Sequence, residues 1–273
     1  MPELPEVETI ARSLAPRIKG RIIAGIELLY RPLLRGRGRR TLETMRGRQV
    51  LGVRRRGKML LVECEGGRAL VFHLKMTGQF LFAAEGAPRD KHIRLVIRFE
   101  DGRDELRFRD VRKFGFLLCL EGEPESACGE LAGLGPEPLE VGFDEFAAIL
   151  RARRGRVKAF LLDQTRLAGI GNIYADEALF AARLHPQRHA NTLSADDIAR
   201  LYAAIRDVLS SGIAHEGASV NWYRKPDGSK GSAQDHLKVY GRAGDPCPRC
   251  GHPIERIVVG QRGTHLCPAC QRR

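Results

Sequence analysis

CPRCGHPIERIVVGQRGTHLCPAC, from Cys247 to Cys270, is the stretch that decides the fold of the C-terminal part of this chain. It holds two CxxC pairs with 16 residues between them. Four thiolates can surround a zinc ion as a tetrahedron, and paired CxxC motifs are typical of structural zinc sites. ERIVV and THL suit two strands with GQRG as their turn, so we expect a zinc ribbon that presents Arg262 in its turn. One structural Zn²⁺ is expected, with four ligands: Cys247, Cys250, Cys267 and Cys270.

The same four cysteines have two alternative interpretations, a disulfide pair and a redox-active CxxC. The chain starts with acidic residues and no apolar signal segment, so we expect a cytoplasmic protein, and disulfides are rare in that compartment. His252 and His265 lie near the cysteines, but four thiolates already complete the site, so both are predicted not to be ligands. Cys64, Cys119 and Cys128 stand among apolar neighbours and are expected to be reduced and partly buried.

The charge balance points to a polyanionic partner. Lys and Arg number 46 against 33 Asp and Glu, a formal net charge of +13. Such an excess most often serves nucleic-acid binding, although an ordinary Arg-rich surface is the alternative. The bases gather in residues 31–40, 54–58 and 151–158, which could converge on one groove or form separate solvated loops. No run of about 18 apolar residues is present, so no membrane span is expected.

The patterning along the chain predicts an α+β fold. An apolar stripe predicts a helix from near Pro5 to just before Pro16. Short alternating runs with Gly turns across 21–120 predict an antiparallel β-sandwich, and 143–214 shows helical spacing, with Ser194 as an N-cap. The expected architecture is an N-terminal β-sandwich with an N-terminal helix, then a helical domain with a C-terminal zinc-ribbon hairpin. Residues 121–140 are rich in Glu, Gly and Pro and are expected to be a linker. The expected boundaries are 1–132 for the sandwich, 133–142 for a hinge, 143–238 for the helical domain with a long loop at 219–238, and 239–273 for the zinc ribbon.

The chain opens MPELPEVET, with two prolines and three glutamates in its first eight residues. Glutamates favour the positive end of a helix dipole, and proline suits a first helical turn, so this could simply be a helix start. The alternative is that removal of Met1 turns Pro2 into a secondary amine with the Glu3 carboxylate beside it. The residues of this stretch alone leave both interpretations open.

The chain contains, in this order, MPELPEVET, RRGKMLL, HLKMTG, DVRKFG, LGPEPL, GIGNIYADEALF, PDGSKGSAQ, VYGR and the terminal Cys pairs. Together these motifs resemble the formamidopyrimidine-DNA glycosylase family, in order and over essentially the full chain. The resemblance implies a base-excision-repair enzyme that removes oxidised purines, notably 8-oxoguanine and formamidopyrimidines, from double-stranded DNA. It also implies AP-lyase cleavage of the abasic strand by β,δ-elimination and a helix-two-turn-helix motif in the helical domain. We expect a monomer, because no sequence feature demands a dimer, and an association with the nucleoid through DNA binding. The related endonuclease VIII branch usually opens MPEGPE, so Leu4 favours the first family.

The resemblance assigns catalytic roles to four residues. Pro2 would attack the sugar C1′ and form a Schiff base, and Glu3 would be the general acid and base. An α-amine has a reference pKa of about 7.7–8 against about 10.4 for Lys, so it is neutral far more often near pH 7. A secondary amine also forms an iminium with no N–H to lose, which remains an electron sink for elimination. Lys58 would assist the β step, and Arg262 the δ step.

Further residues match family positions in the active site and at the DNA. The resemblance implies active-site support from Glu6, His73 and Lys158. It implies DNA contacts from His92, Arg112, Arg153, Asn172, Met76 and Phe114, of which Met76, Arg112 and Phe114 would fill the space left by the extruded base. The loop at 219–238 would cap the lesion. Many family members read KHDHV and DPRRFG where this chain reads KHIRL and DVRKFG, and the departures include Arg94, Val111 and Lys113.

Two other functions remain as alternatives. An endonuclease VIII-like enzyme that prefers oxidised pyrimidines would share the chemistry and differ in the opening motif, the space-filling residues and the capping loop. A non-catalytic zinc-ribbon DNA-binding protein would need neither Pro2 nor Glu3.

Overall fold

The computed structural model of the chain describes residues 1–36, 42–220 and 222–273. The predicted basic cluster at 31–40 therefore lies partly outside the described residues. The chain divides into two compact units, and each is described by itself. The first combines Met1–Gly133 with His215–Ser232, and the second combines Leu134–Ala214 with Ala233–Arg273.

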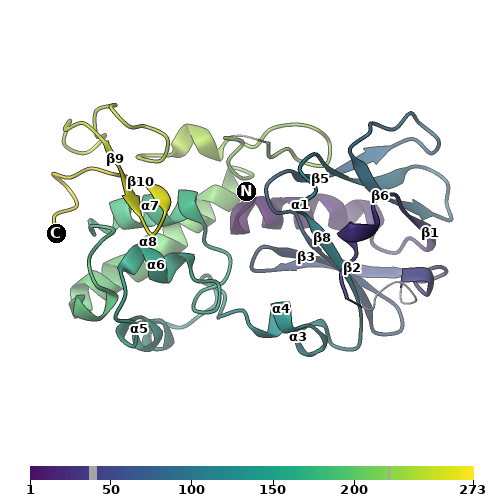
Figure 1. Ribbon diagram of the computed structural model, residues 1–273, viewed down its shortest axis with the longest axis horizontal. Helices are drawn as coiled ribbons and strands as arrows, with labels where there is room; N and C mark the ends of the chain where they lie inside the picture. Colours follow the sequence, from purple (N-terminus) through teal and green to yellow (C-terminus); the bar gives the residue numbers. More distant parts are fainter. Residues whose placement is uncertain (37–41, 221) are drawn as a thin grey trace. The chain divides into compact units, whose positions relative to one another are not determined.

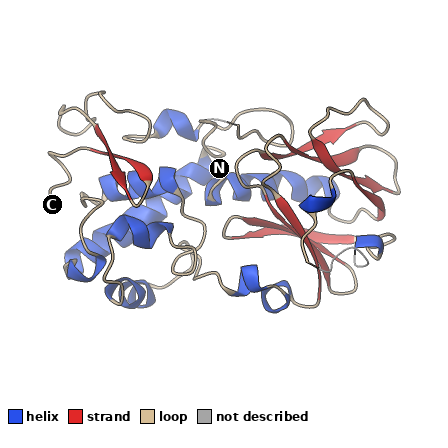
Figure 2. Ribbon diagram, in the orientation of Figure 1, coloured by secondary structure: helices blue, strands red, loops and turns tan. Residues whose placement is uncertain are grey.

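The first unit contains the predicted β-sandwich. Two four-stranded antiparallel sheets have the strand orders β1-β6-β7-β5 and β2-β3-β4-β8. Their strands lie in the purple to teal part of the chain in Figure 1 and are red in Figure 2. Three phenylalanines on β4, β5 and β7 meet in the core, with ring centroids 5.0–5.5 Å apart. The elements are α1 (Leu4–Ile18), β1 (Ile23–Leu28), β2 (Val50–Arg56), β3 (Met59–Cys64), β4 (Arg68–His73), β5 (Gly78–Ala83), β6 (Ile93–Phe99), β7 (Glu105–Asp110) and β8 (Phe116–Glu121), with a 3₁₀ turn at Arg31–Leu33.

Helix α1 packs its apolar stripe against β2 and β3. Leu4, Val7 and Leu14 are fully buried, and the last two belong to the same core as the two sheets. The helix runs through Pro16 to Ile18, so the predicted end before Pro16 is wrong. Proline in the last turn removes only one backbone hydrogen bond, and the buried side chain of Ile18 keeps that turn packed on the core.

Two short helices, α3 (Pro124–Ala127) and α4 (Gly129–Ala132), interrupt the stretch that was expected to be a plain linker. Each is a single turn that starts after an extended residue, and Pro124 and Leu131 are buried. Local turn formation with an apolar anchor is therefore compatible with the Glu- and Gly-rich composition.

The second unit is built around the nearly all-buried helix α7, which contacts α6, α8 and β10. Ser194 caps α8 as predicted, because its hydroxyl accepts a hydrogen bond from the Asp197 amide at 3.1 Å and the Asp197 carboxylate accepts one from the Ser194 amide at 3.2 Å. The elements are α5 (Phe143–Arg151), α6 (Val157–Leu162), α7 (Asn172–Ala181), α8 (Ala195–Ala214), β9 (Glu255–Val259) and β10 (Arg262–Leu266), with 3₁₀ turns at Ala190–Thr192 and Ala233–His236. Among the described residues, none of the helices has the length and apolar character needed to cross a bilayer.

The long loop divides differently from the predicted boundaries. Residues 215–232 belong with the first unit, whereas the sequence placed 219–238 with the helices. Tyr223 explains the difference, because it is 6% exposed and is part of the sandwich core. This buried aromatic side chain attaches an otherwise polar segment to the sandwich core.

Candidate functional site

The two glutamates predicted for catalysis form the start of α1. Glu3 is the N-cap and Glu6 the third helical residue, and the side chain of each accepts a hydrogen bond from the backbone amide of the other, a capping box. The bond from the Glu3 amide to Glu6 Oε2 is 2.7 Å. Both carboxylates are buried, at 3% and 1% exposure, and so is Pro2, while Met1 is half-exposed. The capping box therefore confirms the helix start, and the catalytic role of the same residues stays a prediction.

The second oxygen of Glu6 holds the base of the loop at 215–232. Its Oε1 accepts a hydrogen bond from the Ala218 amide at 2.7 Å. Gly217 has φ +80°, and a Cβ there would lie 2.9 Å from Glu6 Cγ. Gly231 closes the loop so tightly that a Cβ would lie 2.2 Å from two backbone carbonyl oxygens. A single buried carboxylate thus links the first residue of the capping box to the base of this loop.

The far part of the loop is held by β5. The side-chain amide of Gln79 donates a hydrogen bond to the Trp222 carbonyl. The indole itself is 55% exposed, the only Trp in the chain. The backbone of Trp222 is therefore held by β5, while its large aromatic ring faces solvent. Gln79 was not singled out in the sequence, where it is one polar residue of an alternating strand.

Lys58 lies in the turn between β2 and β3. The register pairs Arg56 with Met59, so Gly57 and Lys58 form a two-residue hairpin loop. Gly57 has φ +56°, as a type II′ turn requires at its first central position. Lys58 is 7% exposed, which distinguishes it from an ordinary surface lysine.

His73 ends β4 and pairs with Met59, the residue after Lys58. Burial, together with the positive charges of Lys75, Lys58 and Arg35, lowers the pKa of His73 to about 3. Its Nδ1 accepts a hydrogen bond from the Lys75 amide at 3.0 Å, which also requires the neutral ring. His73 is therefore neutral at physiological pH.

The structure brings Met76, Arg112 and Phe114 together, as their predicted common role requires. Arg112 Nη1 contacts Met76 Sδ at 3.0 Å, and its guanidinium lies 4.6 Å from the Phe114 ring centroid. Met76 is 41% and Phe114 is 48% exposed, although large apolar side chains are usually buried. This group is therefore an exposed apolar and cationic projection from the first unit.

Asp110, fully buried at the end of β7, organises the segment that carries Arg112 and Phe114. Its Oδ1 accepts a hydrogen bond from the Thr77 hydroxyl, and its Oδ2 accepts one from the Gly115 amide at 2.8 Å. The Thr77 hydroxyl in turn accepts a bond from the Arg112 amide at 3.1 Å. Sequence reasoning missed Asp110 and Thr77, although each stands inside a quoted motif, DVRKFG and HLKMTG.

Arg94, one of the departures from the family pattern, supports His92. Arg94 is 8% exposed and donates to the Asp110 carbonyl at 2.8 Å and the Lys91 carbonyl at 3.1 Å. Its Nη2 lies 3.4 Å from His92 Nδ1. The substituted position therefore holds a fixed cation beside His92. Lys113 is another departure and has a backbone φ of +59°. Its Nζ lies 5.2 Å from the centroid of the Tyr30 ring.

The remaining predicted DNA contacts lie in the second unit. Arg262 is exposed and is the first residue of β10, so the prediction that it lies within the turn is corrected by one residue. Gly260 and Gln261 have φ +55° and +62°, so they complete a two-residue type I′ turn without it. Asn172 Nδ2 donates to the Gly263 carbonyl at 2.9 Å. The Nε of Arg153 is buried and has no hydrogen-bond partner within the described part of the chain.

Lys158 lies inside the second unit, with 0% exposure. Its Nζ donates to Asp176 Oδ1 at 2.5 Å and to Thr264 Oγ1 at 2.7 Å. The structure therefore places it behind the β9–β10 hairpin. Any support that it gives to catalysis is indirect, through the residues that it holds.

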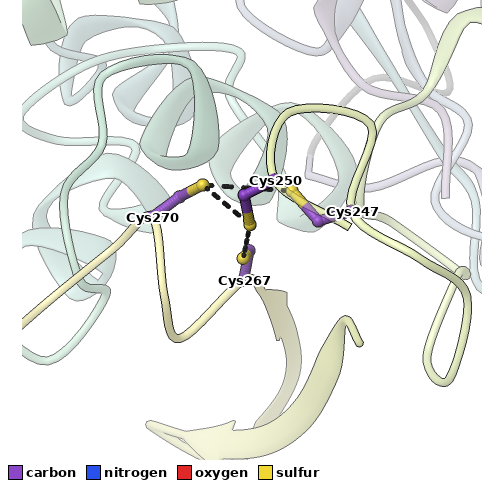
Figure 3. A group of neighbouring side chains, drawn as sticks. All are labelled: Cys247, Cys250, Cys267 and Cys270. Atoms are coloured by element: carbon purple, nitrogen blue, oxygen red, sulfur yellow. Dashed lines mark hydrogen bonds between the residues drawn. The ribbon is translucent and has the colours of Figure 1, made fainter. Parts of the chain in front are cut away.

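The four cysteines of the predicted zinc site converge, as Figure 3 shows, and their Sγ atoms all lie within 4.8 Å of one another. The closest sulfur pairs are 3.5–4.0 Å apart. Zn–S bonds of about 2.3 Å in a tetrahedron put sulfurs about 3.8 Å apart, so the cluster fits one zinc ion with four thiolates. Zinc would be bound by Cys247, Cys250, Cys267 and Cys270, and its role is structural because no ligand position is left open.

The other cysteines have no metal-ligating arrangement among the described residues. Burial raises the pKa of Cys64 and of Cys119 to about 12. Both are therefore unreactive thiols, and Cys128 is buried as well.

Comparison with known families matches three domain models in chain order. Residues 1–117 match the formamidopyrimidine-DNA glycosylase N-terminal domain, residues 134–223 the H2TH domain of that glycosylase, and residues 244–273 the zinc finger found in FPG and IleRS. These domains and the cysteine cluster define a zinc-containing DNA glycosylase. A protein of Herpetosiphon aurantiacus named formamidopyrimidine-DNA glycosylase is 47% identical, covering 99% of this chain and 100% of the relative. The chain belongs to the formamidopyrimidine-DNA glycosylase family.

Solved structures agree with this assignment. The Lactococcus lactis family member in complex with DNA containing an oxidised pyrimidine has a TM-score of 0.91 at 38% identity and covers 100% of both chains. The MutM (Fpg) protein of Thermus thermophilus has a TM-score of 0.89 at 43% identity, covering 99% of this chain and 98% of that one.

Proposed function

We propose that this glycosylase excises oxidised purines, 8-oxoguanine and formamidopyrimidines, from duplex DNA through a Schiff base at Pro2, and then cleaves the strand by β,δ-elimination. The observation that carries the proposal is the pair of buried carboxylates of Glu3 and Glu6, which form the capping box directly after Pro2. A helix start on a protein surface has no need to bury two glutamates. The proposal requires removal of Met1, which is half-exposed.

The chemistry divides between the amine and the carboxylate. The Pro2 nitrogen attacks C1′, the C1′–N bond to the base breaks, and the base leaves with a proton. Glu3 removes the proton from the amine and supplies one to the ring oxygen O4′. The C1′–O4′ bond then breaks, which opens the sugar ring and leaves the C1′–Pro2 iminium. The resulting iminium draws electrons from C2′, so loss of a C2′ proton expels the 3′ phosphate. Loss of the 5′ phosphate follows in the δ step.

Lys58, His73 and Glu6 support the amine. Lys58 lies in a rigid two-residue turn and is assigned to the β step. His73 stays neutral, so it adds no further positive charge beside that lysine. Glu6 holds the Glu3 amide and the base of the loop that would cap the lesion.

DNA binding would use both units. Met76, Arg112 and Phe114 would fill the space left when the damaged base is extruded, since an exposed Met–Arg–Phe group suits insertion between bases. His92, Arg153, Asn172 and Arg262 would contact phosphates, and Arg262 would also assist the δ step. The oxidised-pyrimidine DNA in the Lactococcus lactis complex supports damaged DNA as the partner. We propose that the protein acts as a monomer in the cytoplasm, where the nucleoid is its target; size-exclusion chromatography tests the monomer.

The test is borohydride trapping on duplexes that carry one 8-oxoguanine opposite cytosine, followed by mass mapping of the crosslink. Trapping is expected on Pro2 with Met1 absent. Glu3→Gln is expected to abolish excision, whereas Glu8→Gln, a more exposed position on the same helix, is expected to keep it. A crosslink on a lysine, or none on any damaged duplex despite DNA binding, would overturn the proposal.

An endonuclease VIII-like preference is the second candidate, because a family member has been solved with oxidised-pyrimidine DNA. Trapping that is stronger with an oxidised pyrimidine than with 8-oxoguanine would favour it.

A further inference from the structure

The start of β10 is backed by a buried polar network that the proposed chemistry does not use. Lys158 on α6, Asp176 on α7 and Thr264 on β10 are each at most 1% exposed. Besides its ion pair with Asp176, the Lys158 Nζ donates to the Thr264 hydroxyl at 2.7 Å. Burying an ion pair costs several kcal/mol of desolvation per ion, and apolar packing often gives equal or better stability. Stability alone is therefore a weak reason for this network.

The network ends on the backbone of Arg262. The Thr264 hydroxyl, which accepts from Lys158, donates its own hydrogen to the Arg262 carbonyl at 3.0 Å. The next carbonyl, that of Gly263, accepts bonds from Asn172 Nδ2 at 2.9 Å and from Lys158 Nζ at 3.3 Å. The carbonyls of Arg262 and Gly263 are thus both held by hydrogen bonds that lead back to side chains of α6 and α7.

Asp176 completes the arrangement on the other side of Thr264. Its Oδ2 accepts a hydrogen bond from the His265 amide at 2.8 Å. The adjacent helical residue, Glu177, accepts three backbone amides of residues 238–240 at 2.8–2.9 Å. Helix α7 therefore carries two consecutive buried carboxylates, one for the hairpin and one for the segment that leads into the ribbon.

The cysteine cluster cannot perform the same task at Arg262. Cys267 directly follows β10, whereas Arg262 begins it, five residues away. Extended chain rises about 3.3 Å per residue, so the two ends are about 16 Å apart. Zinc fixes one end of the hairpin, and the polar network fixes the end that carries the arginine.

We propose that Lys158 and Thr264 form a hydrogen-bond relay that positions Arg262 for the δ-elimination. Lys158 and Thr264 are positioning residues, and neither touches DNA. The inference rests on the role of Arg262 in the proposed function. Because Pro2 and Glu3 lie in the other unit, the relay governs the fate of the abasic intermediate and leaves formation of the Schiff base intact.

Thr264→Val provides the sharpest test, because it removes the hydroxyl and keeps the shape of the side chain and the Lys158–Asp176 ion pair. Thr264→Ser keeps the hydroxyl. Thr192→Val is the matched control, since the Thr192 hydroxyl donates to the His189 carbonyl at 2.9 Å in an exposed turn of the same unit. Each protein is given a duplex with a preformed abasic site. The readouts are borohydride trapping, the ratio of δ to β products, and zinc per chain.

Thr264→Val is expected to lower the ratio of δ to β products about fivefold, the effect of losing one buried hydrogen bond, with trapping and zinc content unchanged. Thr264→Ser and Thr192→Val should match the wild type. Combined with Arg262→Ala, Thr264→Val should add no further loss, because both act on one group.

Three results would overturn the relay: an unchanged product ratio in Thr264→Val, an equal defect in Thr264→Ser, or loss of zinc from Thr264→Val. Failure of the proposed function gives a different pattern. In that case wild-type protein itself is not trapped on abasic DNA. A normal product ratio in Arg262→Ala with normal trapping would remove only the role of Arg262, and with it the relay.

Discussion

Replacement of His73 by Asn should remove a pH-dependent loss of stability. The His73 ring packs on Phe116, with centroids 5.3 Å apart, and its Nδ1 accepts the Lys75 amide. Protonation would put a hydrogen on the nitrogen that must accept, and would add a positive charge near Lys58 and Arg35. Asparagine can keep the acceptor through its side-chain oxygen and cannot titrate.

The magnitude follows from the two pKa values of His73. An unfolded histidine titrates near 6.5, and the folded one titrates at about 3. Between these values the unfolded chain binds more protons, so the free energy of unfolding falls as the pH falls. From pH 7 to 4.5 the full shift corresponds to about 2.5 kcal/mol. The ring is only partly shielded from solvent, so about 1–2 kcal/mol is expected.

The assay is urea unfolding of wild type, His73→Asn and His236→Asn between pH 7 and 4.5, followed by the fluorescence of Trp222, which lies in the same unit as His73. The stability of His73→Asn relative to wild type should rise by about 1–2 kcal/mol as the pH falls. All three proteins share the zinc site, so any release of zinc cancels in the differences. The exposed His236 serves as control. Equal slopes for His73→Asn and wild type, or an NMR titration of the His73 ring near its ordinary pKa, would refute the reasoning.

Three further predictions concern the loop and the zinc site. Glu6→Gln leaves one oxygen for two backbone amides, so its free energy of unfolding in urea should fall by about 2–3 kcal/mol. The control Glu8→Gln should lower it by under about 1 kcal/mol. Equal losses would contradict the role of Glu6. Gly231→Ala should open the loop, since its Cβ would lie 2.2 Å from the carbonyl oxygens of Glu216 and Gly217; the measurement is limited proteolysis, and wild-type resistance would contradict this. Chelation of zinc should expose four additional reactive thiols and unfold residues 244–273, with the sandwich intact by circular dichroism; no gain in thiols would count against a zinc-held ribbon.

Motifs that encode chemistry locally could be predicted from the sequence. The CxxC spacing specified a zinc cluster, and the Gly turns together with alternating runs specified an antiparallel sandwich. Both depend on residues close together in the chain, where spacing alone constrains geometry. Basic clusters were less informative. Arg54 pairs with Glu63 and Glu125, and Arg55 pairs with Glu8, so much of that cluster's charge is neutralised by residues from other segments.

The sequence by itself determined the family, the α+β class, the cysteine site and the carboxylates behind Pro2. Only the tertiary structure decided what those residues hold. Glu6 reaches Ala218 across 212 positions, and Lys158 reaches Thr264 across 106. Such pairs carry no spacing signal, because they form only when packing brings distant segments together and a buried polar group must find a partner. Packing also turned Lys158 from an apparent surface base into an internal support for Arg262.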